Sequence, residues 1–244
     1  GIKVPIRGKN SYYENFSDIL IINRGVHEPL EEYCFQELIK TLNKKNSKNF
    51  VMLELGAYWG HYSMWLKSNF NLANCYLVEP DIKNFECGIH NFQINNLDGI
   101  FINEKVSTTN FTVDKFKKSN PQIKFIDILH SDIQGYELEM LKNAENCLAE
   151  NFVNYIFIST HSEDLHIKCI DYLKKFNYEI DVSSGFDQET TSGDGILIAR
   201  SKNAEKFLFN TAFLGRKKII NSSPKEIINY LNEQIKDISK PNNL

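Results

Sequence analysis

Closely spaced cysteines are absent from this sequence. The five cysteines are odd in number, irregularly spaced and never separated by only two residues, so the chain shows neither a disulfide framework nor a zinc knuckle. They are Cys34, Cys75, Cys87, Cys147 and Cys169. We therefore expect reduced thiols and a cytoplasmic protein.

Long apolar runs and an excess of basic residues are also missing. No stretch approaches the roughly 18 apolar residues that a membrane span requires, and 28 Lys and Arg against 31 Asp and Glu give a formal net charge of −3. Domains that bind nucleic acid usually carry a clear basic excess. These absences argue against a membrane span and against a nucleic-acid partner, while 244 residues that are 42% hydrophobic can bury a substantial core.

The third absence concerns glycine. The segment MLELGAYWGHYS at 52–63 has only Gly56 and Gly60, in the pattern ExGxxxG, and it lacks the third glycine and the tight first turn of the dinucleotide fingerprint. The GK[ST] signature of a P-loop is missing too. A ligand with a ribose but no diphosphate bridge fits this pattern, and S-adenosylmethionine is such a ligand.

The sequence does contain a regular alternation of apolar runs and amphipathic segments. Apolar runs predict buried strands, and helical spacing of apolar residues predicts the helices between them. The predicted strands are 49–55, 74–81, 99–103, 123–132, 154–160, 178–183 and 195–200. The predicted helices are 27–45, 61–70, 81–96, 135–150, 163–176 and 223–238. No helix separates the last two strands, so we expect them to be antiparallel.

This order predicts an α/β fold. We expect a Rossmann-like, seven-stranded, mostly parallel sheet with helices on both faces and a terminal antiparallel pair. We divide the chain into an N-terminal helical or lid segment (1–48), a cofactor-binding domain (49–200) and a C-terminal helical extension (201–244).

The predicted site lies at the carboxyl ends of the strands, where open parallel sheets bind their ligands. Gly56 permits a sharp bend without a side chain, and Glu54 precedes it by two residues. Glu79 ends the second strand, where an acid can accept both hydrogen bonds of a ribose diol. Asp132 and His161 end the fourth and fifth strands and should reach the same rim.

Four blocks resemble the FkbM-type S-adenosylmethionine-dependent methyltransferases, from about residue 26 to residue 200. They are MLELGAYWGHYSMWL, CYLVEPD, IDILHSDIQGYELEMLKNA and YIFISTHS. The third block keeps Asp132, Gly135 and Glu137 of the usual Asp-x-Glu-Gly-x-Glu, but Gln134 stands where Glu is usual. The resemblance implies a methyltransferase that acts on a hydroxyl of a sugar, a nucleotide-sugar or a polysaccharide precursor, with a small-molecule or glycan acceptor.

The resemblance also implies a cofactor site. Glu54, Gly56 and Gly60 would shape the cofactor loop, Glu79 would hold the ribose, and 103–107 would lie beside the adenine. The candidate cofactor-binding residues are Glu54, Gly56, Ala57, Tyr58, Gly60, Tyr62, Ser63, Glu79, Pro80, Val106, Ser107 and Asp132.

Methyl transfer to a hydroxyl also needs a destination for the hydroxyl proton. His161 is our first choice for the general base, because histidine titrates near neutral pH. Asp132 would orient it, contact the methionine part of the cofactor or, together with His161, ligate a divalent metal. Among the other histidines we expect His130 to be structural, His166 to be a surface or boundary residue, and His61 to be a polar group at a helix start.

Two further points stay open at this stage. Tyr12, Tyr13, Tyr58 and Trp59 could form a stacking wall for a sugar ring, or Tyr12 and Tyr13 could simply pack at a domain edge. The alternatives in function are a nicotinamide-dependent oxidoreductase on a related fold, a methyltransferase for a non-sugar small molecule, and a non-catalytic binding domain. We expect a homodimer, because C2 dimers are the commonest assemblies.

Overall fold

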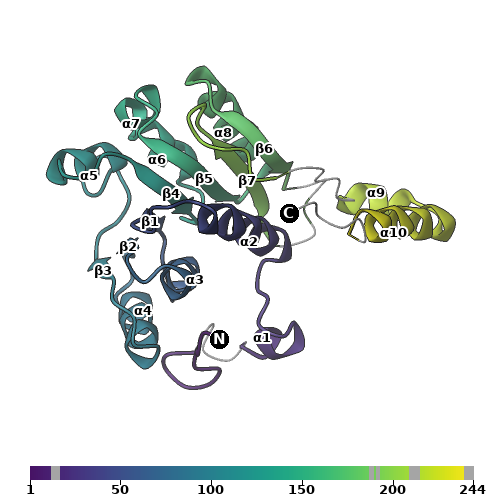
Figure 1. The fold of residues 1–244 in the computed structure, drawn as a ribbon, viewed down its shortest axis with the longest axis horizontal. Helices are drawn as coiled ribbons and strands as arrows, with labels where there is room; N and C mark the ends of the chain where they lie inside the picture. The colour runs from purple at the N-terminus through teal and green to yellow at the C-terminus, as the bar shows by residue number, and fades with distance from the viewer. Residues whose placement is uncertain (12–16, 187–189, 191–192, 209–214, 239–244) are drawn as a thin grey trace.

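The computed structural model describes residues 1–11, 17–186, 190, 193–208 and 215–238 (Figure 1). Tyr12 and Tyr13, for which the sequence suggested packing or a stacking wall, lie outside the described residues.

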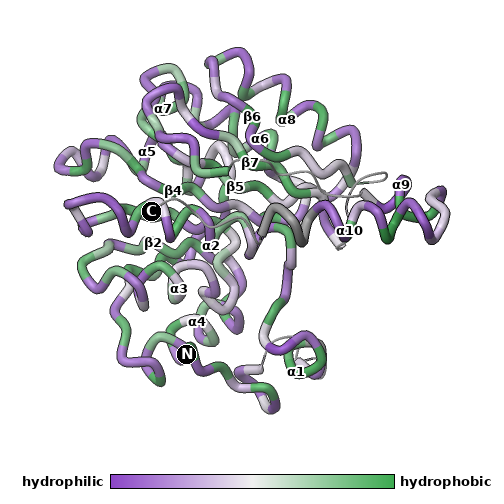
Figure 2. Tube along the Cα trace, turned by 45° about the vertical axis from the view of Figure 1, so that its right-hand side comes forward, coloured by the Kyte–Doolittle hydropathy of each residue, from purple (hydrophilic) through white to green (hydrophobic). Residues whose placement is uncertain are grey.

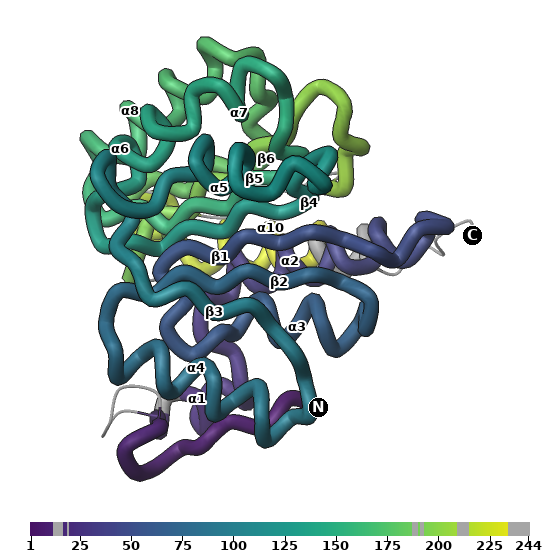
Figure 3. The backbone as a smooth tube through the Cα atoms, turned by 90° about the vertical axis from the view of Figure 1, so that its left-hand side faces the viewer, coloured from purple at the N-terminus to yellow at the C-terminus, as the bar shows by residue number. Residues whose placement is uncertain are grey.

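Seven strands form one sheet in the order β3-β2-β1-β4-β5-β7-β6 (Figure 3). The strands are β1 (Val51–Leu55), β2 (Asn74–Val78), β3 (Ile100–Ile102), β4 (Ile126–Ser131), β5 (Val153–Thr160), β6 (Glu179–Ser184) and β7 (Gly195–Arg200). Pairing is parallel between β1 and β2, β1 and β4, β2 and β3, and β4 and β5. Strand β7 is antiparallel to both β5 and β6. The predicted mostly parallel sheet with a terminal antiparallel pair is therefore confirmed.

The helices of the described residues are α1 (Asp18–Ile22), α2 (Pro29–Asn43), α3 (His61–Asn69), α4 (Ile82–Ile94), α5 (Val113–Ser119), α6 (Glu137–Lys142), α7 (Glu145–Ala149), α8 (Glu163–Lys175), α9 (Arg216–Asn221) and α10 (Pro224–Ile238). Helices α2 to α8 cover the two faces of the sheet. Side chains of α2, α3 and α4 share one hydrophobic core with the sheet, and side chains of α5, α6, α7 and α8 share the other.

Successive strand residues alternate between the two cores, as the pleat of a strand requires. In β1, Met52 belongs to the core beneath α2 and α3, whereas Leu53 and Leu55 belong to the core on the opposite face. Glu54 has the same facing as Met52 but lies one pleat nearer the carboxyl end. Burial on both faces explains why this strand is nearly all apolar in sequence and why its single acid stands out.

Helix α2 is part of the main core. Its residue Phe35 is fully buried and contacts Phe157 of β5 with ring centroids 5.7 Å apart. Phe207, which follows the last strand, packs on the same Phe157 ring at 6.2 Å. The expected boundaries at residues 48 and 200 therefore do not coincide with breaks in packing, and a lid role for 1–48 stays a prediction.

The predicted helix 135–150 is two helices, α6 and α7. The chain leaves helical geometry at Ala144, where φ is −112° and ψ is 15°. The Asp114 carboxylate then accepts the backbone N–H groups of Asn146 and Cys147 at 3.1 and 2.9 Å, so an acid from α5 caps the start of α7. A cap supplied from 32 residues away has no local sequence signature.

Two other helices show where local patterns succeed and fail. Ile82, the first residue of α4, is 55% exposed although its spacing suits the apolar face, and the buried residues of the helix begin at Cys87. The last helix has a local cap, because Glu226 N–H donates to Ser223 Oγ and the Glu226 carboxylate accepts the Ser223 N–H at 2.7 Å.

Helices α9 and α10 project away from the sheet (Figure 1). Hydrophilic and hydrophobic residues alternate along α8 and α9, as expected for helices with one apolar side (Figure 2). Within the described part of the chain, no helix is both long enough and apolar enough to cross a membrane.

Candidate functional site

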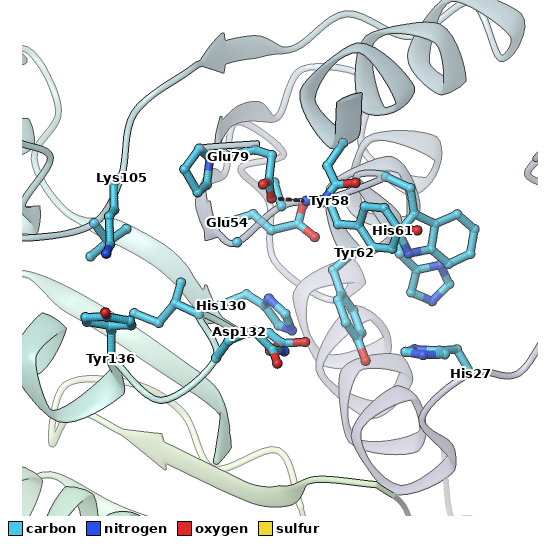
Figure 4. A pocket seen from close by; sticks show the side chains of 18 residues that line it. His27, Glu54, Tyr58, His61, Tyr62, Glu79, Lys105, His130, Asp132 and Tyr136 are labelled. Atoms are coloured by element: carbon cyan, nitrogen blue, oxygen red, sulfur yellow. Dashed lines mark hydrogen bonds between the residues drawn. The ribbon is translucent and has the colours of Figure 1, made fainter. Parts of the chain in front are cut away.

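A cavity of about 510 Å³ opens at the carboxyl ends of β1, β2 and β4. Strand order turns here from β1 toward β2 on one side and β4 on the other, which is the switch point where ligands of open α/β sheets bind. Figure 4 shows Lys105 and Tyr136 at one end of the cavity, His27 and His61 at the other, and Glu54, Glu79 and Asp132 between them.

The first glycine of the loop allows two strand ends to pack closely. Gly56 has φ +70°, and a Cβ on it would lie 1.8 Å from the backbone oxygen of Asp132. The backbone N–H groups of Gly56 and Ala57 both donate to Val78 O, which joins the end of β1 to the end of β2. Glycine is therefore required at position 56 by its neighbours as well as by its backbone conformation.

The second glycine has a different place from the expected one. Gly60 does not line the cavity. It begins α3 with φ +75°, and a Cβ there would lie 2.9 Å from Phe92 and 3.1 Å from Leu77. Its role is to let α3 start close against α4 and β2, beneath the loop.

Glu79 holds the glycine loop and faces the cavity. Its Oε2 accepts the Tyr58 N–H and its Oε1 accepts the Asp81 N–H, both at 2.9 Å (Figure 4). Burial raises the pKa of this carboxyl, although these two hydrogen bonds oppose the shift. Each carboxylate oxygen has a second lone pair, so both can still accept a ribose hydroxyl. The site thus fits the ribose role, which stays a prediction.

Glu54 is 2% exposed and also lines the cavity. Its Oε2 accepts the Ser63 N–H at 3.0 Å, and burial raises the pKa of its carboxyl. Ser63 thus meets the site only through its backbone, because its side chain is not on the cavity wall. Ser107 is also off the wall and contacts Thr109 instead.

The end expected to hold adenine contains residues from two loops. Lys105 and Val106, within the predicted 103–107, line the cavity, as does Pro80. Tyr136 faces them, with Lys105 Nζ 4.3 Å from its ring centroid. Tyr136 could not be foreseen from the sequence, since an aromatic residue just before a helix has no distinctive pattern.

The opposite end is rich in imidazole, and α2 supplies buried acids to it. His130 is 4% exposed, its Nε2 lies 3.2 Å from Glu31 Oε1, and the Glu31 carboxylate accepts the Tyr62 hydroxyl at 2.8 Å. His61 Nε2 lies 3.6 Å from Glu32. His61, Tyr62 and His130 all line the cavity, and the roles expected for His61 and His130 stay predictions.

Two further features of this end were not foreseen. His27 lines the cavity. Burial has the largest effect on its imidazole and His61 the next largest, and both lower its pKa, which favours the neutral form. Glu31 and Glu32 are 1% and 7% exposed. Two acids in the first turn of a helix are ordinary in sequence, because they suit the helix dipole, and only the packing shows that they point inward.

The predicted catalytic pair is brought together, but its members differ in access to the cavity. Asp132 lines the cavity, whereas His161 does not; His161 Nε2 lies 3.3 Å from Asp132 Oδ1. Burial would lower the pKa of His161, but Asp132 and Glu137 outweigh it and raise that pKa to about 10. Burial by itself would raise the pKa of Asp132, but the hydrogen bond and positive charge of His161 have the larger effect, so that the pKa is lowered. The base role of His161 stays a prediction, and this arrangement favours its protonated form.

Gln134 and Asp194 complete the surroundings of this pair. Gln134 Nε2, where the family pattern usually has Glu, donates to Asp132 Oδ1 at 2.9 Å, and the Gln134 backbone has φ 53°. Asp194 Oδ1 lies 3.5 Å from His161 Nε2. The sequence analysis missed Asp194, because it precedes a strand on the antiparallel edge rather than ending a parallel one.

The expectation for His166 is wrong. Instead of lying at the surface, this residue is 2% exposed within α8. Its Nδ1 is 2.8 Å from Thr160 Oγ1 and its Nε2 is 2.9 Å from Ser183 Oγ, so both ring nitrogens have partners. Hydroxyls on β5 and β6 satisfy the hydrogen-bonding groups of this buried imidazole, and burial lowers its pKa.

A seven-stranded sheet of this order, with a glycine bend after β1 and an acid after β2 at one cavity, is the arrangement expected of a Rossmann-like S-adenosylmethionine-dependent methyltransferase. The family model described as "Methyltransferase FkbM domain" matches residues 8–180. The chain therefore belongs to the FkbM methyltransferase family, and S-adenosylmethionine is its cofactor. The nicotinamide-dependent and non-catalytic alternatives give way to this assignment.

Two solved structures of METTL16 share this fold at low sequence identity, and a third structure, of TrmK, matches more weakly. The N-terminal domain of human METTL16 in complex with S-adenosylhomocysteine is 15% identical, with 72% of this chain and 71% of that chain covered and a TM-score of 0.51. The delta-N METTL16 MTase domain is 14% identical, with 72% and 84% covered and a TM-score of 0.51. TrmK of M. capricolum, with S-adenosylhomocysteine, is 16% identical, with 84% and 88% covered and a TM-score of 0.45. No curated protein matches this chain.

Proposed function

We propose that this methyltransferase methylates a hydroxyl of a sugar, a nucleotide-sugar or a polysaccharide precursor. The observation that carries the proposal is the division of the cavity into two chemically different ends. Lys105 and Tyr136 form one end, and His27, His61 and Tyr62 form the other, with Asp132 between them (Figure 4).

The cofactor occupies the first end and the centre in this proposal. Glu79 accepts the ribose hydroxyls, Lys105 and Tyr136 flank the adenine, and Glu54 receives the amino group of the methionine part. These assignments direct the methyl group toward Asp132 and the imidazole end. S-adenosylmethionine supplies an activated methyl group, so the protein's task is to align the acceptor oxygen with it and to exclude water.

The second end suits a polyhydroxylated acceptor. His27, His61 and Tyr62 offer several hydrogen-bonding groups in a small space, and the rings of Trp59 and His61 are stacked at 5.0 Å with an interplanar angle of 15°. Trp59 and His61 both line the cavity, so their stacked rings give this end an aromatic wall. A methyltransferase for a non-sugar small molecule is the alternative that these features also accommodate.

The acceptor hydroxyl must release its proton as the new C–O bond forms. Asp132 is the member of the catalytic pair on the cavity wall, so in this proposal its carboxylate accepts the hydroxyl hydrogen bond and then the proton that methyl transfer releases. His161 lies behind it and orients it. The cytoplasmic location and the homodimer stay predictions.

The test is to incubate the purified chain with S-adenosylmethionine and panels of nucleotide-sugars, oligosaccharides and non-sugar hydroxyl compounds. We expect a mass gain of one methyl group on a carbohydrate, with NMR placing it on oxygen. Transfer confined to non-carbohydrate acceptors, or to nitrogen, would overturn the proposal.

Variants at the acceptor end sharpen this test. His61→Ala should raise KM for the acceptor about tenfold or more, because one buried hydrogen bond to substrate is worth about 1–2 kcal/mol. It should leave the affinity for S-adenosylhomocysteine within twofold. His90→Ala, on α4 and outside the cavity wall, is the matched control.

A further inference from the structure

The surroundings of His161 contain more negative charge than a single imidazole can balance. Glu137 lies 3.1 Å from its Nδ1, while Asp132 and Asp194 lie 3.3 and 3.5 Å from its Nε2. Three carboxylates around one imidazole leave two net negative charges even when the imidazole carries a proton. Like charges at such short range repel strongly in a partly buried site, so a divalent cation would stabilise this cluster.

Glu137 sets the orientation of the His161 imidazole ring through the Nδ1 atom. Glu137 is fully buried on α6, and its Oε1 accepts the backbone N–H groups of Ile133 and Gly135 at 3.2 Å each. The same oxygen lies 3.1 Å from His161 Nδ1. A carboxylate held in this way fixes the Nδ1 proton and the orientation of the ring, as carboxylates behind metal-binding histidines do, and a cation at Nε2 would displace the Nε2 proton that the carboxylates otherwise favour.

The atoms in front of the ring are spaced as ligands of one cation. His161 Nε2 is buried and faces two carboxylate oxygens, one from Asp132 and one from Asp194. One donor atom from each of Asp132, His161 and Asp194 lies within 4.8 Å of the others. Ligands about 2.1 Å from a metal are separated by about 3.0–3.4 Å when adjacent, and the 3.3 and 3.5 Å distances from Nε2 to the two carboxylates are close to this range.

We propose that Asp132, His161 and Asp194 bind a divalent first-row cation such as Mn²⁺, with Glu137 as the positioning residue for His161. Two carboxylate oxygens and one imidazole nitrogen suit Mn²⁺ better than the softer metals that select thiolates. The three ligands come from β4, β5 and the segment before β7, so the site forms only when the antiparallel strand β7 pairs with β5.

The position of this site suggests its use. Asp132 is also on the cavity wall, so the cation lies at the boundary of the acceptor end. A hydroxyl bound to the cation would lose its proton more readily. This use rests on the proposed function, whereas cation binding itself does not.

Cation binding can be measured without any acceptor. Purified full chain, stripped with chelator and dialysed, is titrated with MnCl₂ while electron paramagnetic resonance follows free Mn²⁺. We expect one bound Mn²⁺ per chain, with nitrogen modulation from His161 in the pulsed spectrum. Asp194→Asn should weaken binding at least tenfold, His161→Gln should abolish the nitrogen modulation, and Glu137→Gln should weaken binding about 10- to 100-fold.

Controls separate this proposal from folding and from methyl transfer. Asp171→Asn, an exposed acid on α8, should bind Mn²⁺ as the wild type does, and circular dichroism should show each variant folded. Absence of stoichiometric binding up to millimolar MnCl₂, or binding that Asp194→Asn and His161→Gln leave unchanged, would overturn the cation site. Methyl transfer that persists in chelator together with absent Mn²⁺ binding would remove the cation and leave the proposed function standing.

Discussion

The role of Glu79 can be tested by a change of one atom. Glu79→Gln keeps the shape of the side chain but replaces one carboxylate oxygen with an NH₂ group. In the wild type both oxygens accept a backbone N–H at 2.9 Å, from Tyr58 and from Asp81, and the Glu79 side chain lines the cavity. The variant can therefore accept only one of the two ribose hydrogen bonds.

The expected loss follows from the charge on that bond. A hydrogen bond to a charged acceptor contributes about 1.5–3 kcal/mol, which corresponds to a rise of about 10- to 150-fold in Kd. Isothermal titration with S-adenosylhomocysteine measures this directly. In the variant the NH₂ group also lies against a backbone N–H, so two hydrogen-bond donors meet and the backbone N–H loses its acceptor. The unliganded variant should therefore unfold at a lower temperature than the wild type.

The matched control is Glu104→Gln, which makes the same change at an exposed position just beyond β3 and off the cavity wall. It should leave the Kd within twofold of the wild type. A folded Glu79→Gln variant, verified by circular dichroism at the titration temperature, that binds S-adenosylhomocysteine within threefold of the wild type would refute the ribose assignment.

Two further predictions concern stability. Gly60→Ala should lower the free energy of unfolding by about 2–5 kcal/mol in urea titrations. The backbone angle φ +75° disfavours a side chain by about 1–2 kcal/mol, and crowding of the new Cβ against Phe92 at 2.9 Å adds about 1–3 kcal/mol. A loss below about 1 kcal/mol would contradict this account. Burial raises the pKa of Asp127 from 3.8 to about 6, against the Val51 N–H that it accepts at 2.8 Å, so the folded state holds this proton more tightly than the unfolded state. The resulting stability is present below about pH 4 and is lost as pH rises toward about 6. The free energy of unfolding of Asp127→Asn, relative to that of the wild type, should therefore increase by about 2 kcal/mol between pH 4 and pH 7. The same difference between variant and wild type at both pH values would show the interpretation to be wrong.

The parts of the fold that depend on local pattern were predictable. Strands buried on both faces are mostly apolar, so β1 and β4 could be found without a structure. The two last strands lack an intervening helix, and this absence alone indicated their antiparallel pairing. The break between α6 and α7 could not be found in this way, because the cap on α7 comes from Asp114 in another helix.

The candidate site divides in the same way. Glu54, Gly56, Glu79 and Asp132 follow directly from the ends of predicted parallel strands, and all four line the cavity. Gly60 does follow the first strand as expected, but the space where a Cβ would lie is filled by Phe92. His161 also ends a strand, yet it lies behind Asp132, because strand position alone does not say which neighbour covers a side chain.

The sequence by itself determined the sheet, the glycine bend and the acids at the strand ends, because each depends on periodicity or on the backbone needs of adjacent residues. Tertiary structure alone decided what surrounds those residues. It placed His27 on the cavity wall and Glu31 beside His130, and it brought Asp194 to His161 across 33 residues. Such contacts arise from helix packing and strand pairing between distant segments, and no local pattern specifies them.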